Sequence, residues 1–260
     1  QGVFAGFISN SNALIAAETP KNKAGKALGI MSSATTGGQL LGPFAGGALS
    51  QAFSYRVTFF ITGTLLFICF VLSVFFIHED DFVPVKNGQR GNFKETVKEF
   101  KSGQLIIGLL LTTLIIQAAN NSINPIVSLY VRSLMHNSGQ VVFASGVIAA
   151  LPGIATVAAA SYFGGLGDRI GTHKIILGGL IGSIILFFLT AFVRNTVELG
   201  VCRFLVGFTD ACLFPQVQTM LTKHSPKELT SRVFSWNQSA IYVGNIFGPL
   251  LGSTVSAHFG

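Results

Sequence analysis

The sequence carries little charge for its length. Asp, Glu, Lys and Arg make up 10% of the 260 residues, whereas soluble globular domains typically contain about 25% of these residues. This shortage excludes an ordinary soluble domain. It accompanies an apolar fraction of 50% and a mean hydropathy of +0.60. The composition therefore predicts a multi-pass protein of the cell membrane, with the lipid bilayer as one of its partners.

Cysteine is scarce as well, and several signatures of enzymes and pumps are missing. Cys69, Cys202 and Cys212 lie in apolar runs and follow neither disulfide nor metal-site spacing, so we expect no metal site. There is no phosphate-binding loop, nucleotide fingerprint or nucleophile triad. These absences argue against an ATP-driven pump and an enzyme, so no catalytic residue or cofactor is predicted. We read the net charge of +7 as membrane topology rather than a nucleic-acid partner.

Long apolar runs fill most of the chain, and each is close to the length that spans a bilayer as a helix. They cover residues 1–17, 27–52, 58–77, 104–130, 139–163, 174–193, 197–221 and 233–257. The sequence thus predicts an all-α integral membrane protein with eight to nine spans present. A polar segment, residues 78–102, separates the third and fourth runs, and its 93–100 portion fits an amphipathic helix on the membrane surface.

Basic residues are distributed unevenly between the connections. Most of the 17 Lys and Arg residues fall in alternate connections, which are residues 21–26, 86–101, 169–174 and 223–232. Because cytoplasmic loops carry the excess of positive charge, these connections are predicted to be cytoplasmic.

An internal repeat suggests two related halves. Gly42-Pro43 recurs as Gly248-Pro249, 206 positions later, and Pro20 recurs as Pro226 at the same offset. Both copies are flanked by basic loops on the same predicted face, which indicates parallel repeats. We predict an N-terminal helical bundle over residues 1–77, a cytoplasmic linker over 78–103 and a C-terminal helical bundle over 104–260.

A short glycine-rich stretch, residues 163–174, is predicted to form a tight hairpin between two spans. It reads Gly164-x-Leu166-Gly167-Asp168-Arg169-x-Gly171-x-x-Lys174 and resembles the loop signature of the major facilitator superfamily. Thr172 and His173 depart from that signature, which usually has basic residues there. The resemblance implies two parallel six-helix bundles. It also implies a fragment that lacks helices one to three and the last, consistent with a chain that begins inside an apolar run without Met.

In that setting we expect the hairpin to act as a conformational latch. Asp168 is unusual because a topology loop needs no acid. We predict that its carboxylate lies at the positive end of a helix of the other half, the one that starts near residues 24–26.

Two further patterns resemble signatures of the superfamily. Gly38-x-x-x-Gly42-Pro43-x-x-Gly46-Gly47 resembles the motif of the drug:proton antiporter branch, which implies exchange rather than uptake. The alternative is a helix-packing motif with no directional meaning. Arg203-x-x-Val206-Gly207 resembles a pattern whose first-half copy is linked to proton movement in the family.

Asp210 is an acid within a predicted span. A carboxylate in such a place is costly and functional by default, so Asp210, with Arg203 two turns away, is the proton-coupling candidate. The alternative is a structural polar tie to a neighbouring helix.

Amide side chains line one face of the fourth apolar run, and polar groups in other spans suggest a wet cavity suited to amphiphilic solutes. The cavity candidates are Gln117, Asn120, Asn121, Asn124, Asn237 and Tyr242. Each could instead make an interhelical hydrogen bond.

Taken with the resemblance, these features imply a monomeric secondary transporter that exports amphiphilic drugs or other small organic solutes in exchange for protons by alternating access. One alternative is a symporter that imports a sugar or organic acid on the same fold. A second is a membrane protein that senses a ligand without transporting it.

Overall fold

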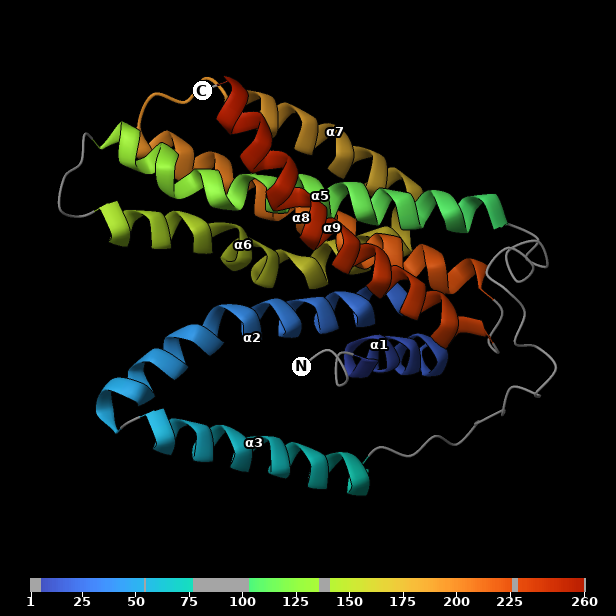
Figure 1. Ribbon diagram of the computed structural model, residues 1–260. Helices are drawn as coiled ribbons and strands as arrows, with labels where there is room; N and C mark the ends of the chain where they lie inside the picture. The colour runs from blue at the N-terminus through green and yellow to red at the C-terminus, as the bar shows by residue number, and fades with distance from the viewer. Residues whose placement is uncertain (1–5, 54, 77–102, 136–140, 226–228, 260) are drawn as a thin grey trace. The chain divides into compact units, whose positions relative to one another are not determined.

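A computed structural model describes residues 6–53, 55–76, 103–135, 141–225 and 229–259, and every regular element among them is an α-helix. The predicted all-helical class is confirmed. The elements, labelled in Figure 1, are α1 (Gly6–Glu18), α2 (Ala24–Ala52), α3 (Tyr55–Phe76), α5 (Gly103–Leu134), α6 (Val141–Ile170), α7 (Thr172–Thr190), α8 (Thr196–His224) and α9 (Thr230–Phe259). The predicted surface helix over residues 93–100 lies outside the described residues.

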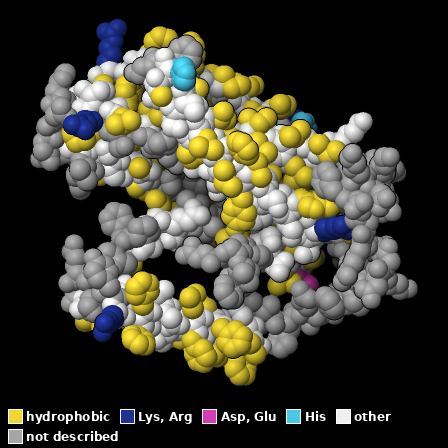
Figure 2. Space-filling model, viewed as in Figure 1, with side chains coloured by type: hydrophobic (Ala, Val, Ile, Leu, Met, Phe, Trp, Pro, Cys, Tyr) yellow, Lys and Arg dark blue, Asp and Glu magenta, His cyan; other side chains and the backbone are white. Residues whose placement is uncertain are grey.

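Apolar side chains cover much of the surface of these helices, as the face in Figure 2 illustrates. Among the described residues, four helices are long and apolar enough to cross a membrane, over Arg56–Phe75, Gly103–Ile123, Ala144–Ile170 and Thr172–Thr190. Helices α2, α8 and α9 match the others in length, but glycine, hydroxyl and amide residues dilute their apolar content. Such residues suit helices that pack on other helices rather than facing lipid on all sides.

By their internal contacts, the residues form two compact units. The first comprises Gln1–Thr36 and Gly91–Gly260, and the second comprises Gly37–Arg90. The boundary falls within α2, so the first part of that helix belongs to the same unit as α1 and α5 to α9, while the rest falls in the second unit with α3. The predicted division into two bundles and a linker follows different boundaries and stays a prediction.

The first unit holds its apolar core between α5, α7, α8 and α9. Ile106, Ile176, Leu213, Leu221 and Val233 are buried there against one another. A second cluster joins α5, α6, the segment after α7 and the start of α8, and it includes Val127, Val131, Ile148, Val193 and Leu199. The two clusters hold α8 along its length, so its polar side chains are fixed in relation to α5 and α6.

The helix boundaries agree with the predicted repeat. α2 begins at Ala24 and α9 begins at Thr230, which is the same offset of 206 residues that relates the two Gly-Pro motifs.

The second copy of the glycine motif is a close helix crossing. A Cβ atom on Gly244 would lie 2.8 Å from the Leu114 carbonyl oxygen of α5, and one on Gly248 would lie 2.6 Å from the Ala118 carbonyl oxygen. Gly252 approaches Ser122 of α5 in the same way. In the first copy, a Cβ atom on Gly38 or Gly42 would have no described atom within 4 Å. Pro43, Gly46 and Gly47 fall in α2, but their packing lies outside what the structure describes.

The predicted hairpin over residues 163–174 is wrong in one respect. α6 continues to Ile170 and α7 begins at Thr172, so a single residue, Gly171, makes the turn. Its φ of 108° is a conformation that favours glycine. The other glycines of the stretch are helical, and two of them, Gly164 and Gly167, approach neighbouring helices closely.

Candidate functional site

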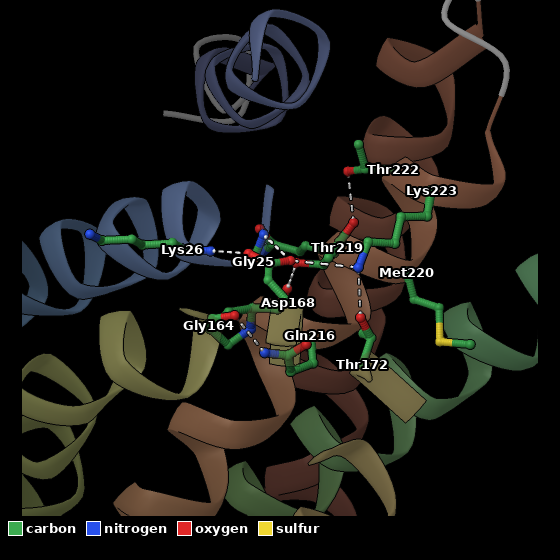
Figure 3. Close-up of polar contacts among 12 residues, drawn as sticks. Gly25, Lys26, Gly164, Asp168, Thr172, Gln216, Thr219, Met220, Thr222 and Lys223 are labelled. Carbon is green, nitrogen blue, oxygen red and sulfur yellow. Dashed lines mark hydrogen bonds and ion pairs between the residues drawn. The ribbon is translucent and has the colours of Figure 1, made fainter. Parts of the chain in front are cut away.

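The carboxylate of Asp168 lies at the N-terminus of α2, in the place predicted for it. The backbone N–H of Gly25 donates to Asp168 Oδ1 at 3.2 Å, and that of Lys26 donates to Oδ2 at 3.0 Å. The first N–H groups of a helix have no partner within the helix, and its dipole favours a negative charge there. This contact, shown in Figure 3, therefore joins the end of α6 to the start of α2.

Lys223, near the C-terminal end of α8, completes this contact. Its Nζ lies 3.5 Å from Asp168 Oδ1 and donates to Thr172 Oγ1 at 3.0 Å. The Asp168 side chain is 6% exposed and that of Lys223 is 28% exposed. Sequence reasoning treated Lys223 only as a topology charge and Thr172 only as a departure from the signature. The distribution of basic residues between the connections gave no signal for this pairing.

Glycines allow α2 and α6 to meet backbone to backbone beside Asp168. A Cβ atom on Gly25 would lie 2.5 Å from the Gly164 carbonyl oxygen, and one on Gly29 would lie 2.5 Å from the Ala160 carbonyl oxygen. At Gly165 the nearest atom would be 3.8 Å away. Gly164 thus belongs to the crossing, and its neighbour Gly165 does not.

The remaining residues of the signature have other surroundings. Arg169 and Lys174 are exposed, as their predicted topological role requires. The N–H of Gly171 donates to the Gly167 carbonyl at 3.1 Å, which ends α6, and the N–H of Lys174 donates to the Gly171 carbonyl at 3.2 Å. Gly167 packs against the amide of Gln216 from α8.

Asp210 occupies a different environment along α8. The amide Nδ2 of Asn120 in α5 donates to Asp210 Oδ1 at 2.7 Å. Arg203, two turns earlier on α8 and only 5% exposed, interacts with the same carboxylate electrostatically. The two residues predicted as a proton-coupling pair thus lie on one helix within range of an electrostatic interaction, and the structure adds Asn120, which was predicted as a cavity residue.

The other cavity candidates form bonds between α5 and α9. Thr113 Oγ1 donates to Asn237 Oδ1 at 2.9 Å. Gln117 Nε2 and Asn121 Nδ2 both donate to Asn245 Oδ1, at 2.7 Å and 2.9 Å. Each pair makes the interhelical bond that was the alternative to a solute contact. Tyr242 is 39% exposed, and the side chain of Asn124 lies outside the described residues.

Asn245 was not predicted as part of the candidate site. Its side-chain oxygen accepts hydrogen bonds from two of the predicted cavity residues, Gln117 and Asn121. The signal available in the sequence was an amide in a second span that could face the amide-rich span. Among the described residues, no group of three or more His, Cys, Asp or Glu side chains could hold a metal ion.

Comparison with known proteins gives concordant matches. The model of the Major Facilitator Superfamily matches residues 1–149 and 109–260. Proteins named multidrug resistance protein MdtG from Salmonella dublin, Salmonella arizonae and Salmonella typhi are each 46% identical over 259 residues. Those alignments cover 100% of this chain and 64% of each relative. The chain therefore spans just under two thirds of the length of these relatives.

Proposed function

Because the chain belongs to the Major Facilitator Superfamily, we propose that it forms much of a secondary transporter that exports small amphiphilic organic solutes in exchange for protons. Membership in this superfamily places it among transporters rather than enzymes. The names of its relatives, which are multidrug resistance proteins, support a drug-like solute.

The main support for proton coupling is the position of Asp210 and the hydrogen bond that it accepts. It is an acid in a long helix among apolar residues, and the group that donates a hydrogen bond to it, the side chain of Asn120, is a neutral amide. Acids in such places mark ion and proton pathways. The NH2 group of this amide can donate a hydrogen bond to the carboxylate, and its oxygen can instead accept a hydrogen bond from the protonated acid, so the pair suits either protonation state of Asp210.

The polar bonds between α5, α8 and α9 supply a second part of the mechanism. Gln117, Asn121 and Asn245 are amides whose hydrogen bonds can be exchanged for bonds to a solute. Gln117 and Asn121 lie on the same helix as Asn120, α5, and Asn245 faces them from α9. A solute that binds among them would compete for the α5 side of the Asp210 site, which would link solute binding to proton release.

The contact between Asp168 and α2 supplies the gate. We expect it to close the cytoplasmic side in one state and to break in the other, with rocking of helix groups around the central site. The solute and the proton shift the equilibrium between the two states by the difference in their binding free energies to each state.

Flux in membrane vesicles tests the direction and the coupling. The probe is a fluorescent amphiphilic cation, and a pH gradient of either sign is imposed. Exchange predicts uphill movement of the cation in the direction opposite to the flow of protons under each gradient. Movement in the same direction as the protons would instead support the symporter, and no gradient-driven movement in active preparations would contradict transport.

A further inference from the structure

We propose that Gln216 is a positioning residue that links the Asp210 site to the Asp168 contact through α8. This inference rests on the proposed function, because it concerns how a change at Asp210 reaches the gate. It assigns a role to a side chain that neither the loop signature nor the cavity pattern singled out.

Gln216 ties α8 to the last turns of α6. Its side chain is 0% exposed, and Nε2 donates to the Phe163 carbonyl at 2.7 Å and to the Gly164 carbonyl at 3.3 Å. Figure 3 shows the amide beside Gly164 and Asp168. Because the amide is buried and donates to carbonyls of α6, this bond fixes the register of α8 against the segment that carries Asp168.

Gly167 makes this contact possible. A Cβ atom at Gly167 would overlap the Gln216 amide group. The glycine of the loop signature therefore provides the space that the Gln216 side chain occupies, one residue before the latch carboxylate.

Three polar groups along α8 thus contact α5 or the end of α6. Asp210 bonds Asn120 of α5, Gln216 bonds the end of α6, and Lys223 pairs with Asp168. They are separated by six and seven residues, which is about 9 and 10.5 Å along a helix axis. A displacement of α8 at Asp210 would therefore also move Gln216 and Lys223, which contact the segment of α6 that carries Asp168.

A proline stands next to the linking residue. Pro215 lies inside α8, and a proline removes one backbone hydrogen bond and permits bending. Without a tie, such a bend could absorb a movement that begins at Asp210. The bond from Gln216 to α6 follows the proline directly and would pass the movement to α6 instead.

Cysteine labelling measures this link. Ala24 is 0% exposed at the start of α2, so Ala24→Cys reports opening of the Asp168 contact. The three native cysteines are replaced by alanine, and a membrane-impermeant maleimide is applied to vesicles with the cytoplasmic face outward. Asp210→Asn mimics the proton-loaded state, which an exporter must open toward the cytoplasm to release its proton.

We expect Asp210→Asn to raise the labelling rate about threefold or more, in line with coupling energies found between sites in proteins. Gln216→Met keeps the side-chain volume but has no hydrogen-bond donor. In a protein that carries Gln216→Met, Asp210→Asn should change the labelling rate by less than about 1.5-fold. Gln218→Met, the same change two residues away on α8, is the matched control and should leave the threefold response intact.

Equal responses to Asp210→Asn with and without Gln216→Met would overturn the proposal, and so would no response in the native background. If Gln216→Met does not reach the membrane, Gly167→Ala displaces the same amide and should abolish the response in its place. The proposal that the protein is an exporter is tested separately. It fails if the unmodified protein gives no proton-driven flux, whatever the labelling rates are.

Discussion

Asp168 and Asp210 are acids of adjacent helices, and their surroundings differ in kind. Asp168 receives two backbone N–H groups from the N-terminus of α2 and lies beside the ammonium group of Lys223. Asp210 receives one neutral amide from Asn120 and has Arg203 as its charged neighbour. The first carboxylate joins helices at a helix end, whereas the second lies between helices in the middle of α8.

This difference indicates which acid can exchange a proton and which can hold two helices together. Every group around Asp168 donates, so a proton on its carboxylate would displace a donor. Around Asp210, an amide can reverse its role between donor and acceptor. We therefore assign proton exchange to Asp210 and gate closure to Asp168, and the following predictions test that division.

Asp210→Asn should have the largest effect, because it removes the group that exchanges the proton. One pH unit corresponds to about 1.4 kcal/mol per proton, enough to sustain about a tenfold solute gradient. In the variant, the ratio of solute concentrations across the vesicle membrane should fall to about one, while solute binding persists. Asp210→Glu should keep part of the activity. An asparagine variant that still concentrates solute at the normal rate would make Asp210 a structural tie.

Gly164→Ala should have the next largest effect. Its new methyl group would meet the Gly25 backbone, and overpacking of this kind costs about 1–3 kcal/mol. The closed cytoplasmic side should be destabilised, which appears as faster labelling of Ala24→Cys and slower transport. Gly165→Ala is the matched control, because a Cβ atom there has 3.8 Å of clearance. Equal defects in the two variants would contradict a specific crossing of α2 and α6.

Asp168→Asn should slow transport without uncoupling it. The variant keeps an oxygen for one N–H group of α2 but loses the charge that favours the helix N-terminus, a term of about 0.3–1 kcal/mol, and the attraction of Lys223. We expect turnover to fall several-fold while the solute gradient reached per pH unit stays unchanged. If turnover is normal at normal expression, the carboxylate does not act as a latch.

Lys223→Met should have the smallest effect. Ion pairs near a surface contribute about 0.2–1 kcal/mol, and Asp168 keeps both backbone donors in this variant. Turnover should fall by less than in Asp168→Asn, and the double substitution should be no worse than Asp168→Asn alone. An additive double variant would show that Lys223 acts apart from Asp168.

The sequence predicted the parts of this account that depend on pattern. Glycine spacing, the Asp-Arg pair and the repeat led to the helical membrane fold and to the contact between Asp168 and the start of α2, which the structure confirms. The Asp210 and Arg203 pairing followed from helical spacing along a single helix.

What the sequence could not predict depends on which residues meet across helices. Gln216 and Lys223 have no partner at a helical spacing in the sequence, because their contacts lie about 50 residues away on α6. The turn at Gly171 was predicted too long, since the same glycines that suit a hairpin also suit a helix in close contact. The amides of α5 were assigned to a cavity, but which of them bond α9 follows only from the packing of the two helices.

Proton movement driven by the solute tests the central claim most directly. Vesicles without a pH gradient are loaded with a pH indicator, and a gradient of the amphiphilic cation is imposed on the unmodified protein, Asp168→Asn and Asp210→Asn. We predict that the internal pH changes by the same amplitude in the first two, more slowly in Asp168→Asn, and not at all in Asp210→Asn. A full pH change in Asp210→Asn, or a lost amplitude with Asp168→Asn, would contradict the division of function between the two acids.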